Sequence, residues 1–153
     1  MTNVQAKPAR IVVGVDGSPQ SKQALRWAAQ LASPSGARIE AVSAWEFPTT
    51  YGWAAWPAGW DPARDALKEL TATVDEVFGA HRPRGIDLVV REGGAARVLL
   101  EQSKGALMII VGSRGHGGFV GLLIGSVSAN IAEHASGPVL VVHGETNPAE
   151  LTS

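Results

Sequence analysis

The residues best suited to bind an anion lie in one glycine-dense stretch, residues 107–128. The stretch opens with a short apolar run that has the length of a buried strand, and it ends at Ser126, which can stand at or near the start of a helix. Glycine lets a backbone approach a ligand closely, and a helix start presents N–H groups and the positive end of the helix dipole. Strand, glycine loop and helix start together predict a phosphate-binding site.

The spacing of these glycines narrows the kind of site. The stretch contains no GxxxxGK[ST] motif, no lysine follows Gly105, and no GxGxxG motif opens the first apolar run. What occurs is Gly112-x2-Gly115-x9-Gly125-Ser126 directly after an apolar run. This spacing resembles the nucleotide-binding signature of the universal stress protein family. The resemblance extends to IVVGVDGS at 11–18 and GPVLVVH at 137–143, so it covers nearly the whole chain.

The resemblance implies an ATP-binding stress-response protein and a particular set of binding residues. Backbone N–H groups and serine hydroxyls would cradle the ribose and phosphates, at Gly112, Gly115, Gly125, Ser126, Val127 and Ser128. Adenine needs a flat apolar slot, and the wall candidates are Gly14, Val15, Ala44 and Val111. The alternative for these wall residues, simple core packing, is compatible with the same role.

Three polar side chains flank this expected cradle. Asp16 is either a turn aspartate or, as the resemblance implies, a carboxylate near the ribose and phosphates. In the second case it could hold Mg²⁺, which is commonly bound by one or two carboxylates together with phosphate oxygens. Arg114 and His116 lie inside the glycine loop, where they either contact phosphate or face solvent.

The elements that must position these residues follow from the hydrophobic pattern. Apolar runs predict strands at 10–15, 39–45, 86–90, 107–111 and 139–142. Cap-plus-proline pairs, Ser18-Pro19 and Asp61-Pro62, open helices that run to about Ser33 and over roughly four turns. Two further helices are expected at 95–104 and 126–135. This alternation predicts an α/β fold, a three-layer α/β/α sandwich with a parallel sheet and right-handed crossovers.

The family resemblance adds the strand order, 3-2-1-4-5, which is Rossmann-like. In that order the first and fourth strands are neighbours at a topological switch point, where ligands of such sheets bind. Asp16 follows the first strand and Gly112 ends the fourth. The two stretches that could do chemistry are therefore expected to meet in one crevice.

Length and composition limit the remaining possibilities. The 153 residues are expected to form a single domain over 10–143, with a flexible lead-in at 1–9 and a flexible tail at 144–153. The formal net charge of −1 gives no electrostatic footprint for nucleic acid. The absence of cysteine, of a transmembrane-length run and of a signal-peptide pattern predicts a cytoplasmic protein without membrane contact.

Two segments are candidates for contact with partner proteins. Residues 46–60 have no helical or strand period and predict a long loop, whose Trp53, Trp56 and Trp60 could cover adenine, meet a partner or close a local aromatic core. Trp27 and Trp45 are predicted to be packing residues. The strand at 139–142 would leave an apolar edge, and the resemblance implies a homodimer formed by antiparallel pairing of this strand.

The sequence favours a binding protein over an enzyme. It has no cysteine, no GxSxG and no HExxH motif. Its glycine loop lacks the lysine and paired carboxylates that would neutralise a reacting γ-phosphate, so at most slow ATP hydrolysis or autophosphorylation on Ser126 or Ser128 is expected. Cyclic AMP is an alternative ligand, because its single negative charge demands less neutralisation from a loop without lysine, and ADP is a further alternative. A nucleotide-independent interaction module acting through the tryptophan segment is the third alternative.

Overall fold

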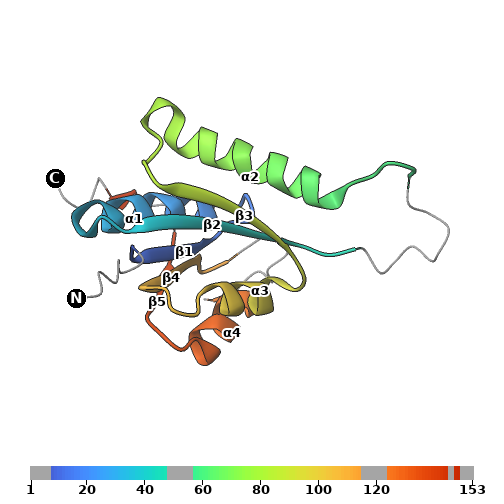
Figure 1. The fold of residues 1–153 in the computed structure, drawn as a ribbon. Helices are drawn as coiled ribbons and strands as arrows, with labels where there is room; N and C mark the ends of the chain where they lie inside the picture. Colours follow the sequence, from blue (N-terminus) through green and yellow to red (C-terminus); the bar gives the residue numbers. More distant parts are fainter. Residues whose placement is uncertain (1–7, 48–56, 115–123, 145–146, 149–153) are drawn as a thin grey trace, which may run out of the picture.

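The computed structural model describes residues 8–47, 57–114, 124–144 and 147–148. It contains a five-stranded sheet in the order β3-β2-β1-β4-β5, with every pair parallel. The strands are β1 (Arg10–Gly14), β2 (Arg38–Trp45), β3 (Ile86–Glu92), β4 (Met108–Gly112) and β5 (Val139–Val142). Helices α1 (Pro19–Ser35) and α2 (Pro62–Phe78) lie on one side of the sheet, and α3 (Ala95–Gln102) and α4 (Ser126–His134) lie on the other (Figure 1). The predicted fold and strand order are confirmed.

The sheet is buried on both faces, which explains the continuous apolar runs. Side chains alternate along a strand, so Ile11 and Val13 pack toward α1 and α2 while Val12 between them packs toward α3 and α4. Strand β4 repeats the pattern, with Ile110 in the first core and Ile109 in the second. Two apolar cores therefore hold the helices in place on either side of one sheet.

The helix starts were predicted correctly, but the end of α1 was not. Ser18 accepts a hydrogen bond from the amide of Ser21 at 3.2 Å, and Asp61 accepts one from the amide of Arg64 at 3.1 Å. Helix α1 passes through Pro34 and stops at Gly36, whose φ of 67° gives a left-handed cap. Because Pro34 sits in the last, solvent-exposed turn, its missing N–H does not interrupt the helix earlier.

Other element ends shift by one or two residues. Strand β3 continues to Glu92 because its register with β2 extends as far as Trp45. Strand β4 runs from Met108 to Gly112, one residue later than predicted, and pairs with β5 through Gly112. Residues 1–7, 48–56, 115–123, 145–146 and 149–153 lie outside the described residues, and with them most of the predicted flexible ends and of the tryptophan loop. Within the predicted tail Pro148 is buried.

Arg10 ties the start of β1 to β2 and to the end of α3. Its guanidinium donates to Glu40 Oε2 at 3.1 Å, to the Gln102 carbonyl at 2.6 Å and to the Lys104 carbonyl. The Gln102 side-chain amide donates to the same carboxylate oxygen of Glu40 at 2.9 Å. Helix α3 ends at Gln102, two residues before the predicted end, and the carbonyls that Arg10 binds lie at this end of the helix.

Arg10→Met is expected to lower the free energy of unfolding by about 1–2 kcal/mol, because the half-buried Glu40 loses its cation and two carbonyls lose a donor. Arg38→Met is the matched control. Arg38 pairs with Asp87, but the two side chains are 44% and 47% exposed, so its loss should cost no more than about 1 kcal/mol. Urea denaturation of both variants measures the difference. Equal losses would contradict the special role of Arg10.

None of the helices in the described part of the chain is both long enough and apolar enough to cross a membrane.

Candidate functional site

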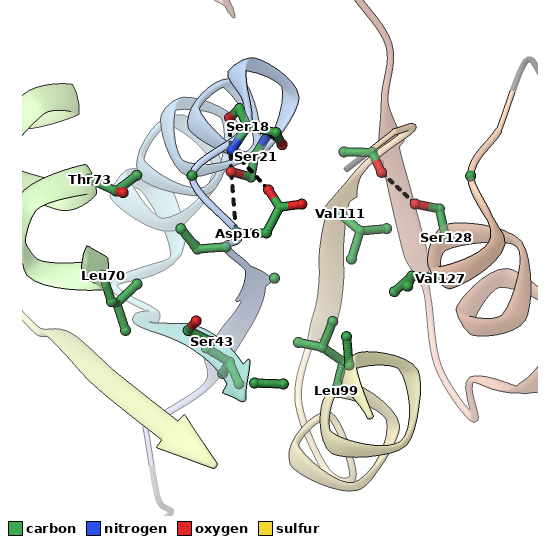
Figure 2. Close-up of a pocket in the computed structure, with 18 of the residues that line it drawn as sticks. Asp16, Ser18, Ser21, Ser43, Leu70, Thr73, Leu99, Val111, Val127 and Ser128 are labelled. Atoms are coloured by element: carbon green, nitrogen blue, oxygen red, sulfur yellow. Dashed lines mark hydrogen bonds between the residues drawn. The ribbon is translucent and has the colours of Figure 1, made fainter. Parts of the chain in front are cut away.

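A cavity of about 660 Å³ lies at the carboxyl ends of β1, β2 and β4. This is the place where the strand order reverses, since β1 is paired with β2 on one side and with β4 on the other. Its volume lies within the range of small-molecule sites. Figure 2 shows its walls, with α2 on one side, α3 and α4 on the other, and the turn between β1 and α1 in the middle.

Nearly all the residues predicted for the site line this cavity. They come from β1 and its turn, β2, β4 and the start of α4: Gly14, Val15, Asp16, Ala44, Val111, Gly112, Arg114, Gly125, Ser126, Val127 and Ser128. Gly115 and His116 lie outside the described residues. The structure therefore brings together two stretches of sequence that are about a hundred residues apart.

Two helices line the cavity at residues that were not predicted from the sequence, and one of them is α3, with Ala95 and Leu99. Helix α2 contributes Glu69, Leu70 and Thr73, and β2 contributes Ser43 beside them. Figure 2 shows Leu70 and Thr73 across the cavity from Val127 and Ser128. The available signal was Ser43, a polar residue at a position where the alternation of Ile39 and Ala41 calls for an apolar one.

Three of the described helices begin at the cavity, because Ala95 at the start of α3 also lines it, and the starts of α1 and α4 differ in how their backbone amides are satisfied. At α1 the Asp16 carboxylate accepts from the Ser18 amide at 2.9 Å, and Ser18 Oγ accepts from the Ser21 amide. At α4 the N-cap is Gly125, which has no side chain to accept a hydrogen bond. The first bond within α4 runs from the Ala129 amide to the Gly125 carbonyl at 2.9 Å. The amides of residues 126–128 therefore have no acceptor within the helix.

The serine hydroxyls at the start of α4 are not equivalent. Ser128 is only 4% exposed, and its hydroxyl donates to the Gly112 carbonyl. In this structure the hydroxyl proton is directed to the end of β4, so a phosphate contact by this hydroxyl would require that bond to break, and the contact stays a prediction. Ser126 is exposed and stands at the first helical position, one residue after the N-cap. Gly125 donates its own amide to the Ser113 carbonyl, so in this structure that amide is already engaged.

At two positions of the site, close packing of neighbouring residues leaves no room for a side chain larger than that of glycine. A Cβ on Gly112 would lie 2.6 Å from Gln20 Cβ and 2.9 Å from the Gln20 carbonyl carbon. A Cβ on Gly14 would lie 2.9 Å from Leu99 Cδ1 and 3.2 Å from Val111 Cγ1. Gly112 thus lets the first turn of α1 approach the end of β4, whether or not a ligand is bound.

The charged groups of the cavity are few. Among the described residues that line it, Arg114 is the one cation, and Asp16 and Glu69 are the carboxylates. No group of three or more potential metal ligands occurs in the described ranges. A Mg²⁺ ion would accordingly have Asp16 as a protein ligand and would take its other ligands from phosphate and water, an arrangement that Mg²⁺ accepts.

The aromatic residues on either side of the tryptophan loop form a chain of contacts. The rings of Trp45 and Phe47 lie 5.1 Å apart, and those of Phe47 and Trp60 lie 6.1 Å apart, both edge to face. The Trp60 indole donates to Asp65 at 3.1 Å. Trp60 thus belongs to a local aromatic cluster, whereas Trp53 and Trp56 lie outside the described residues.

Trp27 and β5 bear on the other packing and partner predictions. Trp27 packs against the core beneath α1 and α2, as predicted. In the part of the chain that the structure describes, β5 pairs with β4 alone, so its outer edge is available. The homodimer stays a prediction.

Comparison with known proteins assigns the chain to a family. The model of the universal stress protein family matches residues 8–143. The chain belongs to this family. Among curated relatives, a universal stress protein of Mycolicibacterium smegmatis is 36% identical over 146 residues, 91% of this chain and 49% of that protein. One from Mycobacterium tuberculosis strain H37Rv is 37% identical over 136 residues, 87% of this chain and 44% of that protein. The chain thus spans about half the length of these relatives.

A solved structure of the family is similar over almost its whole length. It is described as a universal stress protein in complex with cAMP, and it is 28% identical to this chain with a TM-score of 0.63. The match covers 90% of this chain and 98% of that one. The similarity supports the universal stress protein fold for this chain.

Proposed function

We propose that this universal stress protein binds an adenine nucleotide, in the first place ATP, and acts as a nucleotide-dependent regulator in the stress response. The observation that carries the proposal is the start of α4. Residues 126–128, whose backbone amides have no acceptor within the helix, line a cavity that Arg114 also lines. N–H donors, the positive end of a helix dipole and a guanidinium are the groups that bind phosphate.

The rest of the cavity suits a nucleoside. Val15, Ala44, Leu99 and Val111 supply apolar walls next to the turn that carries Asp16. A purine ring is flat and apolar on both faces, so it gains from burial against such walls. The Asp16 carboxylate can accept hydrogen bonds from ribose hydroxyls, because an ionised carboxylate is an acceptor only.

Cyclic AMP is the second candidate ligand, and the charge of the cavity favours it. The described lining residues include one cationic residue and two acidic residues, and the glycine loop contains no lysine. A cyclic phosphate with a single negative charge demands less neutralisation than a triphosphate. The cAMP complex of the similar family member supports the same alternative. ATP would need Mg²⁺ at Asp16 to offset its charge.

Thermal denaturation with ATP, ADP, AMP and cyclic AMP, each with and without Mg²⁺, tests the proposal. A ligand at a hundred times its Kd adds about 2.7 kcal/mol of stability, which is roughly 5–10 °C for a domain of this size. If ATP is the ligand, Mg²⁺ should increase its shift in the wild type, and Asp16→Asn should remove that increase. If cyclic AMP is the ligand, its shift should not depend on Mg²⁺.

Purified protein must first be denatured and its supernatant chromatographed, so that nucleotide carried through purification is detected and removed. If nucleotide-free protein then shows no shift with any of these compounds, the proposal is wrong. The interaction module acting through the tryptophan segment would then be the leading alternative, and truncation of Trp53 and Trp56 would test it by loss of partner binding.

Binding rather than turnover is the role that the cavity supports. Its single described cation leaves the charge of a γ-phosphate in a transition state largely uncompensated. We further propose that nucleotide occupancy acts on a homodimer formed through the outer edge of β5, which among the described strands pairs with β4 alone. Comparing the dimerisation constant with and without nucleotide by analytical ultracentrifugation addresses this coupling.

A further inference from the structure

We propose that Thr73 of α2 recognises the exocyclic amine of the bound base, so that the wall of the cavity formed by α2 determines base specificity. This inference rests on the proposed binding of an adenine nucleotide. It concerns the end of the cavity between α1 and α2, where Ser43, Glu69, Leu70 and Thr73 lie.

The orientation of the nucleotide follows from the two ends of the cavity. The end at α4 carries the unsatisfied amides and Arg114, which are the groups that attract phosphate. The opposite end has Glu69 as its charged lining residue among the described residues and lacks a described cation. Figure 2 shows Leu70 and Thr73 at this opposite end. With the phosphates at α4, the base points toward α2.

The hydrogen bonds at this end determine what the base meets. The Thr73 hydroxyl donates to the Glu69 carbonyl at 2.9 Å, so a hydrogen bond from this oxygen to a ligand in the cavity must be one that it accepts. The Ser21 hydroxyl likewise donates to the Ser18 carbonyl at 2.9 Å. Ser43 can donate or accept, so it does not discriminate.

A cavity end that presents hydrogen-bond acceptors favours a base that carries hydrogen-bond donors. The 6-amino group of adenine has two N–H donors. A purine that lacks this group would leave the lone pairs of the Thr73 oxygen without a donor from the ligand, at a position that is only 8% exposed. The loss of one neutral hydrogen bond corresponds to about a 2- to 10-fold lower affinity.

Isothermal titration with AMP and with purine riboside 5′-monophosphate tests the inference, because the two ligands differ only in the amine. Wild type should prefer AMP by about 2- to 10-fold. Thr73→Val keeps the shape of the side chain but removes the oxygen, and it should abolish this preference. Thr73→Ser keeps the oxygen and should retain it. Thr71→Val is the matched control, since Thr71 makes the same type of bond, to Leu67 at 2.7 Å, but does not line the cavity.

The outcomes separate this inference from the proposed function. Equal binding of both ligands to wild type, or an undiminished preference in Thr73→Val, overturns the role of Thr73 while nucleotide binding stands. Failure of AMP, ATP and cyclic AMP alike to bind overturns both. Melting temperatures without ligand show whether each variant is folded. If Thr73→Val is not folded, the preference for AMP over purine riboside 5′-monophosphate is compared between wild type and Thr73→Ser.

Discussion

Ser126→Pro is expected to weaken nucleotide binding about 10- to 100-fold while helix α4 stays intact. Proline is tolerated at the first helical position, and the preceding Gly125 already has the extended conformation that proline requires, with φ −74° and ψ 164°. The substitution therefore removes one amide donor that has no acceptor within the helix. A hydrogen bond to a charged phosphate contributes about 1.5–3 kcal/mol, and each 1.4 kcal/mol is a factor of ten in affinity.

Ser126→Ala is the control that separates the amide from the hydroxyl. It keeps the backbone donor and should lose less affinity than Ser126→Pro. Titration with adenosine adds a second control, because a ligand without phosphate should bind both variants as well as it binds wild type. If Ser126→Pro binds nucleotide with wild-type affinity and is folded by circular dichroism, the amides of α4 are not the phosphate site.

The sequence predicts this end of the cavity well because its signals are local. The apolar run before Gly112, the glycine spacing and the serine at the helix start all lie on one continuous stretch. The strand order did not follow from periodicity, and it came from the family resemblance. Since ligands bind where parallel strands end at a switch point, knowing that order was enough to place Asp16 opposite Gly112.

The α2 wall could not be predicted in the same way, because it depends on how a helix packs across the sheet. Thr73 lies between Leu70 and Val74 on the buried face of α2, where a threonine is compatible with ordinary core packing. The hydroxyl of Ser128 is a similar case. Its sequence position suggested a phosphate contact, but its orientation toward Gly112 depends on the approach of α4 to β4. Both are tertiary effects without a local signature.

Gly112→Ala tests a tertiary contact of this kind, and it is expected to destabilise the protein by about 1–3 kcal/mol without any ligand. The added Cβ would lie 2.6 Å from Gln20 Cβ and 2.9 Å from the Gln20 carbonyl carbon. The second of these atoms is backbone, so α1 must move away from β4 to make room. Because β1, α1 and β4 all border the cavity, the same movement should also weaken nucleotide binding.

Gly137→Ala is the matched control for this substitution. A Cβ at Gly137 meets no described atom within 4 Å and its φ is not in the left-handed region, so its stability should stay within about 0.5 kcal/mol of wild type. Urea denaturation of the nucleotide-free variants measures both effects. If Gly112→Ala keeps wild-type stability but loses nucleotide binding, the glycine serves the ligand alone. A loss of stability without ligand would instead mean that this motif residue is required by helix packing before any nucleotide arrives.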